Sequence, residues 1–128
     1  MGGFLPVPGQ TLYGASKAAV KLFTEGLNSE LTETPVRVSI VFPGAISTNI
    51  AVNSGTMTKE QAAQASKNSS FKTTPAPVAA ATILNGMEKD KYRILVGSDS
   101  KMMDFLYRLS PPYAAHMIYK NMRALLPK

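Results

Sequence analysis

Apolar residues recur at every third or fourth position between residues 12 and 31. This interval matches the 3.6-residue turn of an α-helix and places the apolar side chains along one face. We therefore predict an amphipathic helix over residues 12–31, and the alanines on its apolar face would let another element approach closely. The apolar positions are Leu12, Ala15, Ala19, Leu22, Phe23, Leu27 and Leu31.

A short apolar run follows this helix. Residues 36–42 have the sequence VRVSIVF, rich in β-branched side chains, and Pro43-Gly44 ends the run. A nearly continuous apolar run is typical of a strand that is covered on both faces, as in a parallel sheet. A helix followed by such a strand is half of a βαβ unit. Residues 92–97, with the sequence YRILVG, supply a second predicted strand.

The stretch between residues 45 and 74 is polar and has few large apolar side chains. A long polar connection in a compact domain is usually functional or mobile. It is therefore predicted to be either a lid over a substrate or a plain surface excursion. Within it, residues 58–61 (TKEQ) have the form of a capping box and predict a short helix through Ala65.

The C-terminal part is predicted to hold three helices around the second strand. Thr74-Pro75 has the order of a helix cap and a first-turn proline. Residues 98–100 (SDS) can cap the next helix, and residues 110–112 (SPP) begin the last one. The residues expected to face inward are Ala80, Ile83, Leu84 and Met87, then Met102, Phe105, Leu106 and Leu109, then Met117, Ile118, Met122 and Leu125.

Composition narrows the class of protein. The chain has 128 residues, enough for one small domain, and its hydrophobic fraction of 45% can supply a core. The absence of cysteine excludes a disulfide scaffold and thiolate metal sites, and we expect no metal and a cytoplasmic location. No apolar run is long enough to cross a bilayer.

The net charge of +6 comes from scattered basic residues. The densest cluster, residues 89–91 (KDK), is interrupted by an acid, and no basic stripe with interleaved aromatic residues is present. We therefore expect no nucleic-acid partner. A small anionic ligand, such as a phosphate-bearing cofactor, suits the charge at least as well. The last helix carries Lys120 and Arg123 and could lie on a membrane, but docking on its own domain is favoured.

Tyr13 and Lys17 are the candidates for chemistry. Residues four apart on a helix share one face, so the phenol and the ammonium can share one environment. A nearby positive charge favours the phenolate, which lets a tyrosine act as a general acid or base near neutral pH. Spacing alone favours an ordinary helix with both side chains in water, because such pairs are common. The sequence around the pair and after it changes this interpretation.

The pair Tyr13-x-x-x-Lys17 lies in the context ASKAA and is followed, after the predicted strand, by PGAIST at residues 43–48. With these motifs the chain resembles the C-terminal half of a short-chain dehydrogenase/reductase over essentially all of its length. The resemblance implies an α/β fold, namely the C-terminal part of a doubly wound parallel-sheet (Rossmann-like) domain whose N-terminal strands are absent. It also implies an NAD(P)-dependent oxidoreductase that transfers hydride between nicotinamide and an alcohol/carbonyl substrate, with a family-type homo-oligomer as a further expectation.

The resemblance implies a role for each of the two candidates. Tyr13 corresponds to the catalytic acid/base, which exchanges a proton with the carbonyl or alcohol oxygen. Lys17 corresponds to the lysine that favours the phenolate and binds the nicotinamide ribose hydroxyls. Both roles agree with the electrostatic argument from the residues themselves.

The loop after the predicted strand is implied to bind the cofactor. Ile46, through its backbone, and Thr48, through its hydroxyl, match positions that hold the nicotinamide carboxamide. Pro43 and Gly44 shape that loop at the end of the strand. Without the resemblance, Ser47 and Thr48 would be assigned to helix capping or turn bonding. The cofactor is NAD or NADP, and the sequence does not distinguish them.

The chain also departs from the family pattern. The family's catalytic serine lies roughly a dozen residues before the tyrosine, where it can reach the substrate oxygen with the phenol. No serine precedes Tyr13 in this chain, and the glycine-rich turn that seats the pyrophosphate is also missing. We therefore expect Met1 to be an internal methionine of a longer enzyme, and the truncated chain to be weakly active or inactive. The alternative is a non-catalytic interaction fragment that pairs through the Tyr13 helix.

On this interpretation residues 1–128 form one partial domain. A two-stranded parallel sheet alone leaves too much edge and too little core, which agrees with a missing part. The expected parts are a loop (1–11), the active-site helix (12–31), a strand (36–42), a substrate-loop region (45–74), and the C-terminal helices with the last strand (75–128).

Overall fold

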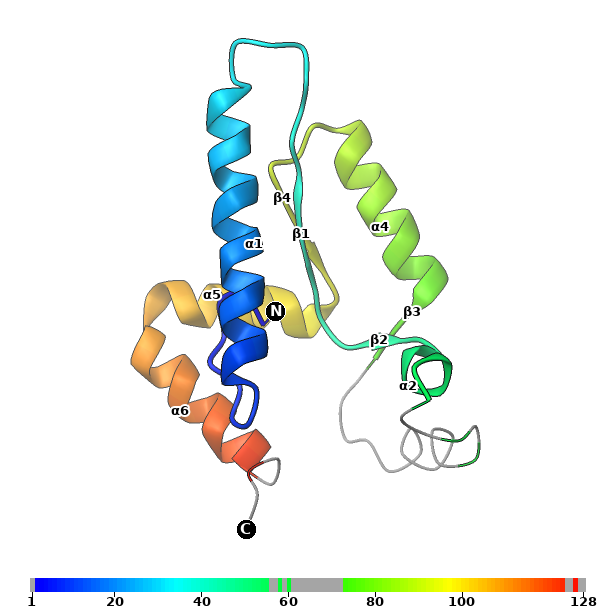
Figure 1. Cartoon of the computed structure of the whole chain (residues 1–128), viewed down its shortest axis with the longest axis vertical. Helices are drawn as coiled ribbons and strands as arrows, with labels where there is room; N and C mark the ends of the chain where they lie inside the picture. The colour runs from blue at the N-terminus through cyan, green and yellow to red at the C-terminus, as the bar shows by residue number, and fades with distance from the viewer. Residues whose placement is uncertain (1, 56–57, 59, 61–72, 124–125, 127–128) are drawn as a thin grey trace.

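The computed structural model describes residues 2–55, 58, 60, 73–123 and 126. Helices lie on both sides of a short parallel strand pair, so the predicted α/β class is confirmed (Figure 1). In chain order the elements are α1 (Thr11–Glu30), β1 (Ile40–Pro43), β2 (Ile46–Ser47), α2 (Ile50–Asn53), β3 (Thr74–Pro75), α4 (Ala76–Glu88), β4 (Arg93–Val96), α5 (Ser98–Leu109) and α6 (Pro111–Met122).

Strands β1 and β4 form the central parallel pair, with Ile40 opposite Arg93 and Pro43 opposite Val96. The strand predicted over residues 36–42 therefore begins four residues late. Its partner β4 begins only at Arg93, so the residues before Ile40 have no strand to pair with in the described part of the chain. A hydrophobic run marks what can be buried, whereas the length of a strand depends on its partner.

A second parallel pair, β2 with β3, was not predicted. Its register places Ile46 opposite Thr74, and the Thr74 backbone N–H donates to the carbonyl of Ala45 at 2.8 Å. Thr74 is thus a strand residue rather than the predicted helix cap, and Pro75 occupies the N-cap position of α4. A two-residue ladder has no hydrophobic period to reveal it. The short helix predicted through Ala65 lies outside the described residues, apart from positions 58 and 60.

The face that α4 packs on β4 matches the predicted face only in part, because Ile83 packs against the core. Ala79 and Gly86 are buried, whereas Leu84 and Met87 are exposed. Gly86 determines this orientation, because a Cβ atom there would lie only 2.6 Å from the side chain of Ile94. Hydrophobic periodicity gives no weight to a glycine, so the predicted face is right at Ile83 but wrong at Leu84 and Met87. The resulting core cluster contains Ala79, Ile94 and Val96, with Val41, Ile46 and Ile83 packed against it.

Helices α5 and α6 form a second cluster with the N-terminal loop. Its buried residues are Leu5, Met103, Ala114 and Ile118. The face predicted to be buried on α5 is wrong in part, because three of its four members are exposed, namely Met102, Phe105 and Leu109. Hydrogen bonds from Ser100 and to Asp104 orient α5 about its axis instead. The Ser100 hydroxyl donates to the carbonyl of Phe42 at 2.7 Å, and Arg93 donates to Asp104 at 2.6 Å. On α6 the predicted Ile118 is buried, while Leu125 lies outside the described residues.

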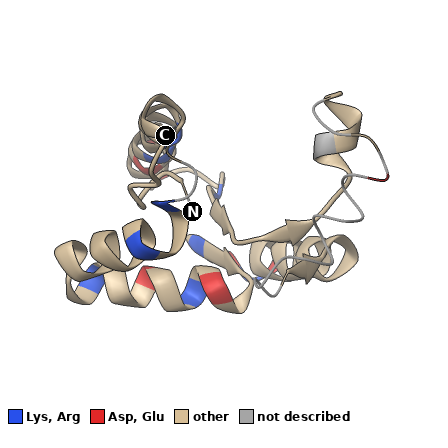
Figure 2. Ribbon diagram, turned by 90° about the horizontal axis from the view of Figure 1, so that it is seen from below, with Lys and Arg blue, Asp and Glu red and all other residues tan. Residues whose placement is uncertain are grey.

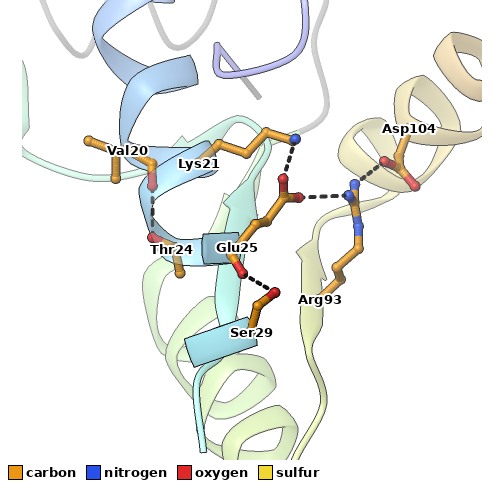
Figure 3. Close-up of polar contacts among 7 residues, drawn as sticks. All are labelled: Val20, Lys21, Thr24, Glu25, Ser29, Arg93 and Asp104. Carbon is orange, nitrogen blue, oxygen red and sulfur yellow. Dashed lines mark hydrogen bonds and ion pairs between the residues drawn. The ribbon is translucent and has the colours of Figure 1, made fainter. Parts of the chain in front are cut away.

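Helix α1 is joined to the sheet by charged side chains rather than by burial. None of its residues is buried. The Lys21 ammonium forms an ion pair with the Glu25 carboxylate at 2.7 Å, within α1. Glu25 also lies 3.8 Å from Arg93 of β4. Arg93 in turn forms an ion pair with Asp104 of α5 (Figure 3). The Arg93 guanidinium also stacks 4.6 Å from the ring centroid of Phe42. This network of Lys21, Glu25, Arg93 and Asp104 is called the α1–β4–α5 ion network below.

Most of the apolar stripe predicted on α1 is exposed, whereas Leu27 and Leu31 at its end are half-buried. Leu22 is 70% exposed and Phe23 72% exposed, and Leu12 at the start of the helix is also exposed. In Figure 2, basic and acidic residues alternate along α5, whereas α6 carries a basic residue and no acidic one. Among the described residues, no helix has both the length and the apolar character needed to span a membrane.

Candidate active site

The N-terminal loop lies directly against the first turns of α1. A Cβ atom on Gly2 would lie 3.0 Å from the ring of Tyr13, and one on Gly3 would lie 2.9 Å from the carbonyl oxygen of Lys17. The two glycines therefore let the loop approach the helix at the level of both candidate residues. The loop and α1 together shape the surroundings of the phenol.

Tyr13 and Lys17 are neighbours on α1, as their spacing predicts. The Lys17 Nζ atom lies 5.3 Å from the centroid of the Tyr13 ring, within the range of a cation–π contact. Tyr13 is 55% exposed, so its hydroxyl is accessible to a reacting molecule. The Ser16 hydroxyl donates to the Tyr13 carbonyl at 2.8 Å, a local bond within the first turns of α1.

A pocket of about 290 Å³ brings this pair to the carboxyl end of β1. The N-terminal loop forms one wall, α1 the second and β1 the third. Pro43 is the residue at the end of β1 that the pocket shares with Tyr13 and Lys17. The lining residues are Gly2, Gly3, Tyr13, Lys17, Val20, Lys21, Ile40, Val41, Phe42 and Pro43.

The other three predicted cofactor residues lie after the strand and do not line this pocket. Gly44 faces the carboxylate of Asp99, Ile46 packs against the cluster under α4, and Thr48 is exposed. In a parallel ladder alternate residues point their N–H groups to opposite edges. Because Thr74 donates to Ala45, the N–H of Ile46 points away from β3.

Asp99 is a residue of this region whose position the sequence did not predict. Residues 98–100 were expected to cap α5, yet the N-cap is Gly97 and no side chain caps the helix. The Asp99 carboxylate instead accepts the backbone N–H of Ala45 at 2.7 Å, across 54 residues of chain. The sequence does contain a signal, because Gly44 and Gly97 each follow a strand and leave space beside the backbone. A glycine does not indicate, however, which side chain fills that space.

A larger cavity of about 580 Å³ adjoins the pocket and shares Gly2 and Gly3 with it. It lies between the N-terminal loop, α1 and α6, and most of its lining is apolar. Tyr107 and Tyr119 contribute aromatic rings to its wall. Within the described ranges, no group of three or more potential metal ligands occurs.

Comparison with known proteins identifies the family. The family profile of short chain dehydrogenases matches residues 1–59, which include Tyr13, Lys17 and the loop 43–48. The chain is also 36% identical over 111 residues to the candidate oxidoreductase SadH of Mycobacterium tuberculosis, covering 84% of this chain and 40% of SadH. No solved structure matches at a significant level.

Other relatives carry the family name. The short-chain type dehydrogenase/reductase y4eK of Sinorhizobium fredii is 47% identical over 49 residues, covering 38% of this chain and 20% of that protein. The mouse dehydrogenase/reductase SDR family member 7B is 30% identical over 94 residues, covering 73% of this chain and 29% of that protein. The chain thus spans well under half the length of each of these relatives. By its motifs, its parallel α/β fold and these matches, the chain belongs to the short-chain dehydrogenase/reductase family.

Proposed function

We propose that this chain carries the proton-transfer and nicotinamide-binding part of an NAD(P)-dependent oxidoreductase that acts on an alcohol/carbonyl pair. Tyr13 gives a proton to the carbonyl oxygen or takes one from the alcohol. Lys17 places a positive charge beside the phenol, which stabilises negative charge on its oxygen when the proton has left. The nicotinamide cofactor, when bound, supplies or accepts the hydride.

The residues present fit a nicotinamide riboside. Lys17 offers an ammonium donor suited to the ribose hydroxyls, and Thr48 offers an exposed hydroxyl. The backbone N–H of Ile46 points away from β3 and suits the carboxamide oxygen. The fold agrees with this use, since ligands of open α/β sheets bind outside the carboxyl ends of the strands.

One observation carries the proposal. A single pocket joins the Tyr13–Lys17 pair to the carboxyl end of β1, although the two lie on different elements. A tyrosine and a lysine on an ordinary solvent-exposed helix face would not be expected to share a pocket with the end of a strand. The family's glycine-rich turn and upstream serine are not matched in this sequence, so we expect the chain alone to show little or no turnover.

Ligand fragments test the proposal on the chain itself. We expect reduced nicotinamide mononucleotide to shift the backbone amide signals of Tyr13, Lys17, Ile46 and Thr48 in a saturable ¹⁵N NMR titration. Adenosine monophosphate, which has the same charge type but no nicotinamide, should leave these four signals in place. Shifts that are equal for both ligands, or that are confined to other residues, would contradict the proposal.

The exposed apolar face of α1 supports a second candidate function, that of a pairing fragment. Leu22 and Phe23 are more than two-thirds exposed, and the helix buries no side chain against its own domain. A contiguous apolar face of this kind is typical of a surface that meets another protein. A second copy of this chain, paired through α1, is the candidate partner.

We expect the double variant Leu22→Gln/Phe23→Gln to weaken self-association by at least about tenfold in sedimentation equilibrium, because each exposed apolar side chain gains from burial. Leu84→Gln on α4 is the matched control, since Leu84 is also an exposed leucine on a helix, and should leave association unchanged. Tyr13→Phe should have no effect on pairing. Equal sedimentation of wild type and double variant as monomers would exclude this second function.

A further inference from the structure

The carboxylate of Asp99 occupies a buried position at the end of β1. Its Oδ2 atom accepts the N–H of Ala45 at 2.7 Å, while its Oδ1 atom is buried and accepts no hydrogen bond in the described part of the chain. A buried carboxylate oxygen without a donor costs free energy. The position of this side chain therefore needs a reason beyond general stability.

Two glycines make room for this carboxylate. A Cβ atom on Gly44 would overlap both carboxylate oxygens, and one on Gly97 would lie 2.5 Å from Oδ1. Gly97 also has φ +94°, a region that residues with a side chain rarely adopt. The ends of β1 and β4 are thus both shaped around one side chain.

Neighbouring hydrogen bonds fix the same point of the chain. The Gly44 N–H donates to Val96 at 2.8 Å, and the Thr74 N–H donates to Ala45 at 2.8 Å. Ala45 is therefore held on both sides, by Asp99 through its N–H and by Thr74 through its carbonyl. From this point the chain leaves the central strand and enters β2.

We infer that Asp99 is a positioning residue for the nicotinamide-binding loop, a role that rests on the proposed function. By holding Ala45, it sets the direction in which the next residue presents its backbone N–H and, two residues further on, the place of the Thr48 hydroxyl. The bond is charge-assisted, so it holds the amide more firmly than a neutral acceptor would. A preorganised loop binds its ligand without first losing conformational freedom.

A purely structural role is the competing explanation. A carboxylate in the first turn of α5 interacts favourably with the helix dipole, whatever the loop does. The two roles predict different effects for a substitution of Asp99. Loss of a dipole contact lowers stability alone, whereas loss of a positioning contact also weakens nicotinamide binding and moves the loop signals.

The test compares Asp99→Ala, Asp99→Asn and Met103→Ala in the whole chain. Met103 is a buried core residue of the same helix, so its truncation reproduces a stability loss without contacting the loop. Each protein is followed by ¹⁵N NMR, first for the amide shifts and exchange protection of Ala45, Ile46 and Thr48. Reduced nicotinamide mononucleotide is then titrated into each protein.

We expect Asp99→Ala to remove the protection of the Ala45 amide and to raise the dissociation constant about tenfold. Asp99→Asn keeps an oxygen acceptor and should recover part of both effects. Gly44→Ala should reproduce the effects of Asp99→Ala, because its new methyl group displaces the same carboxylate. The double variant Gly44→Ala/Asp99→Ala should bind reduced nicotinamide mononucleotide no more weakly than either single variant, because both substitutions break the same contact between Asp99 and Ala45.

Unchanged loop amides in Asp99→Ala, or equal changes in Met103→Ala, would overturn the positioning role. If the wild-type chain binds no nicotinamide mononucleotide, the proposed function itself fails. The ligand-free amide shifts and exchange rates then still decide whether Asp99 holds the loop, so the two failures are distinguishable.

Discussion

Tyr13→Phe is expected to lower kcat by about 10²–10⁴-fold, the usual contribution of a positioned general acid or base. The substitution keeps the ring beside Lys17 and Gly2 and removes only the hydroxyl. Turnover is measured in a SadH chain whose matched segment is replaced by these 128 residues, with NADH or NADPH and a set of aldehydes and ketones. This context supplies the remainder of a relative's length that the chain does not span.

Tyr113→Phe is the matched control for this result. Tyr113 is 58% exposed, close to the 55% of Tyr13, but it lies on α6 outside the pocket. The same hydroxyl is lost, so kcat should stay within about twofold of the parent, because surface substitutions rarely perturb a domain. Equal rates for the two variants would remove Tyr13 from proton transfer.

Asp104→Ala is expected to lower the free energy of unfolding by about 3 kcal/mol, since it leaves Arg93 without its nearest partner. Asp104 is 8% exposed and joins α5 to β4 at 2.6 Å. The figure lies at the lower end for a broken buried pair because the Arg93 side chain keeps 23% of its surface in water. Urea denaturation followed by circular dichroism measures the loss.

Two further variants show whether burial sets this cost. Arg108 also binds Asp104, at 3.0 Å, but its side chain is 59% exposed, so Arg108→Ala should cost less than about 1 kcal/mol. Replacing both partners, in Arg93→Met/Asp104→Leu, should recover more than half of the loss, because Glu25 keeps Lys21 and the Arg108 left without Asp104 is exposed to water. If Asp104→Ala and Arg108→Ala lower the free energy of unfolding by the same amount, burial of the Arg93–Asp104 pair does not set the cost.

The sequence predicted the order and type of the long elements because their apolar residues repeat at a helical or strand interval. The helix around Tyr13 and the strand before Pro43-Gly44 were found in this way, although the strand is shorter than its apolar run. The errors arose where packing depends on something other than apolar side chains. Gly86 turned α4 by its missing Cβ atom, and Ser100 with Asp104 turned α5 by their polar bonds.

The candidate site was predictable to a similar extent. The Tyr13–Lys17 pair could be identified because four residues make one helical turn, and the structure places both side chains in one pocket with Pro43. The assignments of Gly44, Ile46 and Thr48 remain predictions, supported by their place after β1. Asp99 could not be found from the pattern, because its contact with Ala45 joins residues 54 positions apart.

The attachment of α1 has a consequence for motion. A helix that buries no side chain loses little hydrophobic free energy when it leaves the sheet, and the α1–β4–α5 ion network with the loop contacts is what opposes its departure. Segments with few buried contacts open in local unfolding events that cost less than unfolding the whole domain. Strands β1 and β4 and helix α4 retain their own core during such an event. We therefore expect the amide hydrogens of the helix that carries Tyr13 and Lys17 to exchange before those of β1, the strand that ends at Pro43.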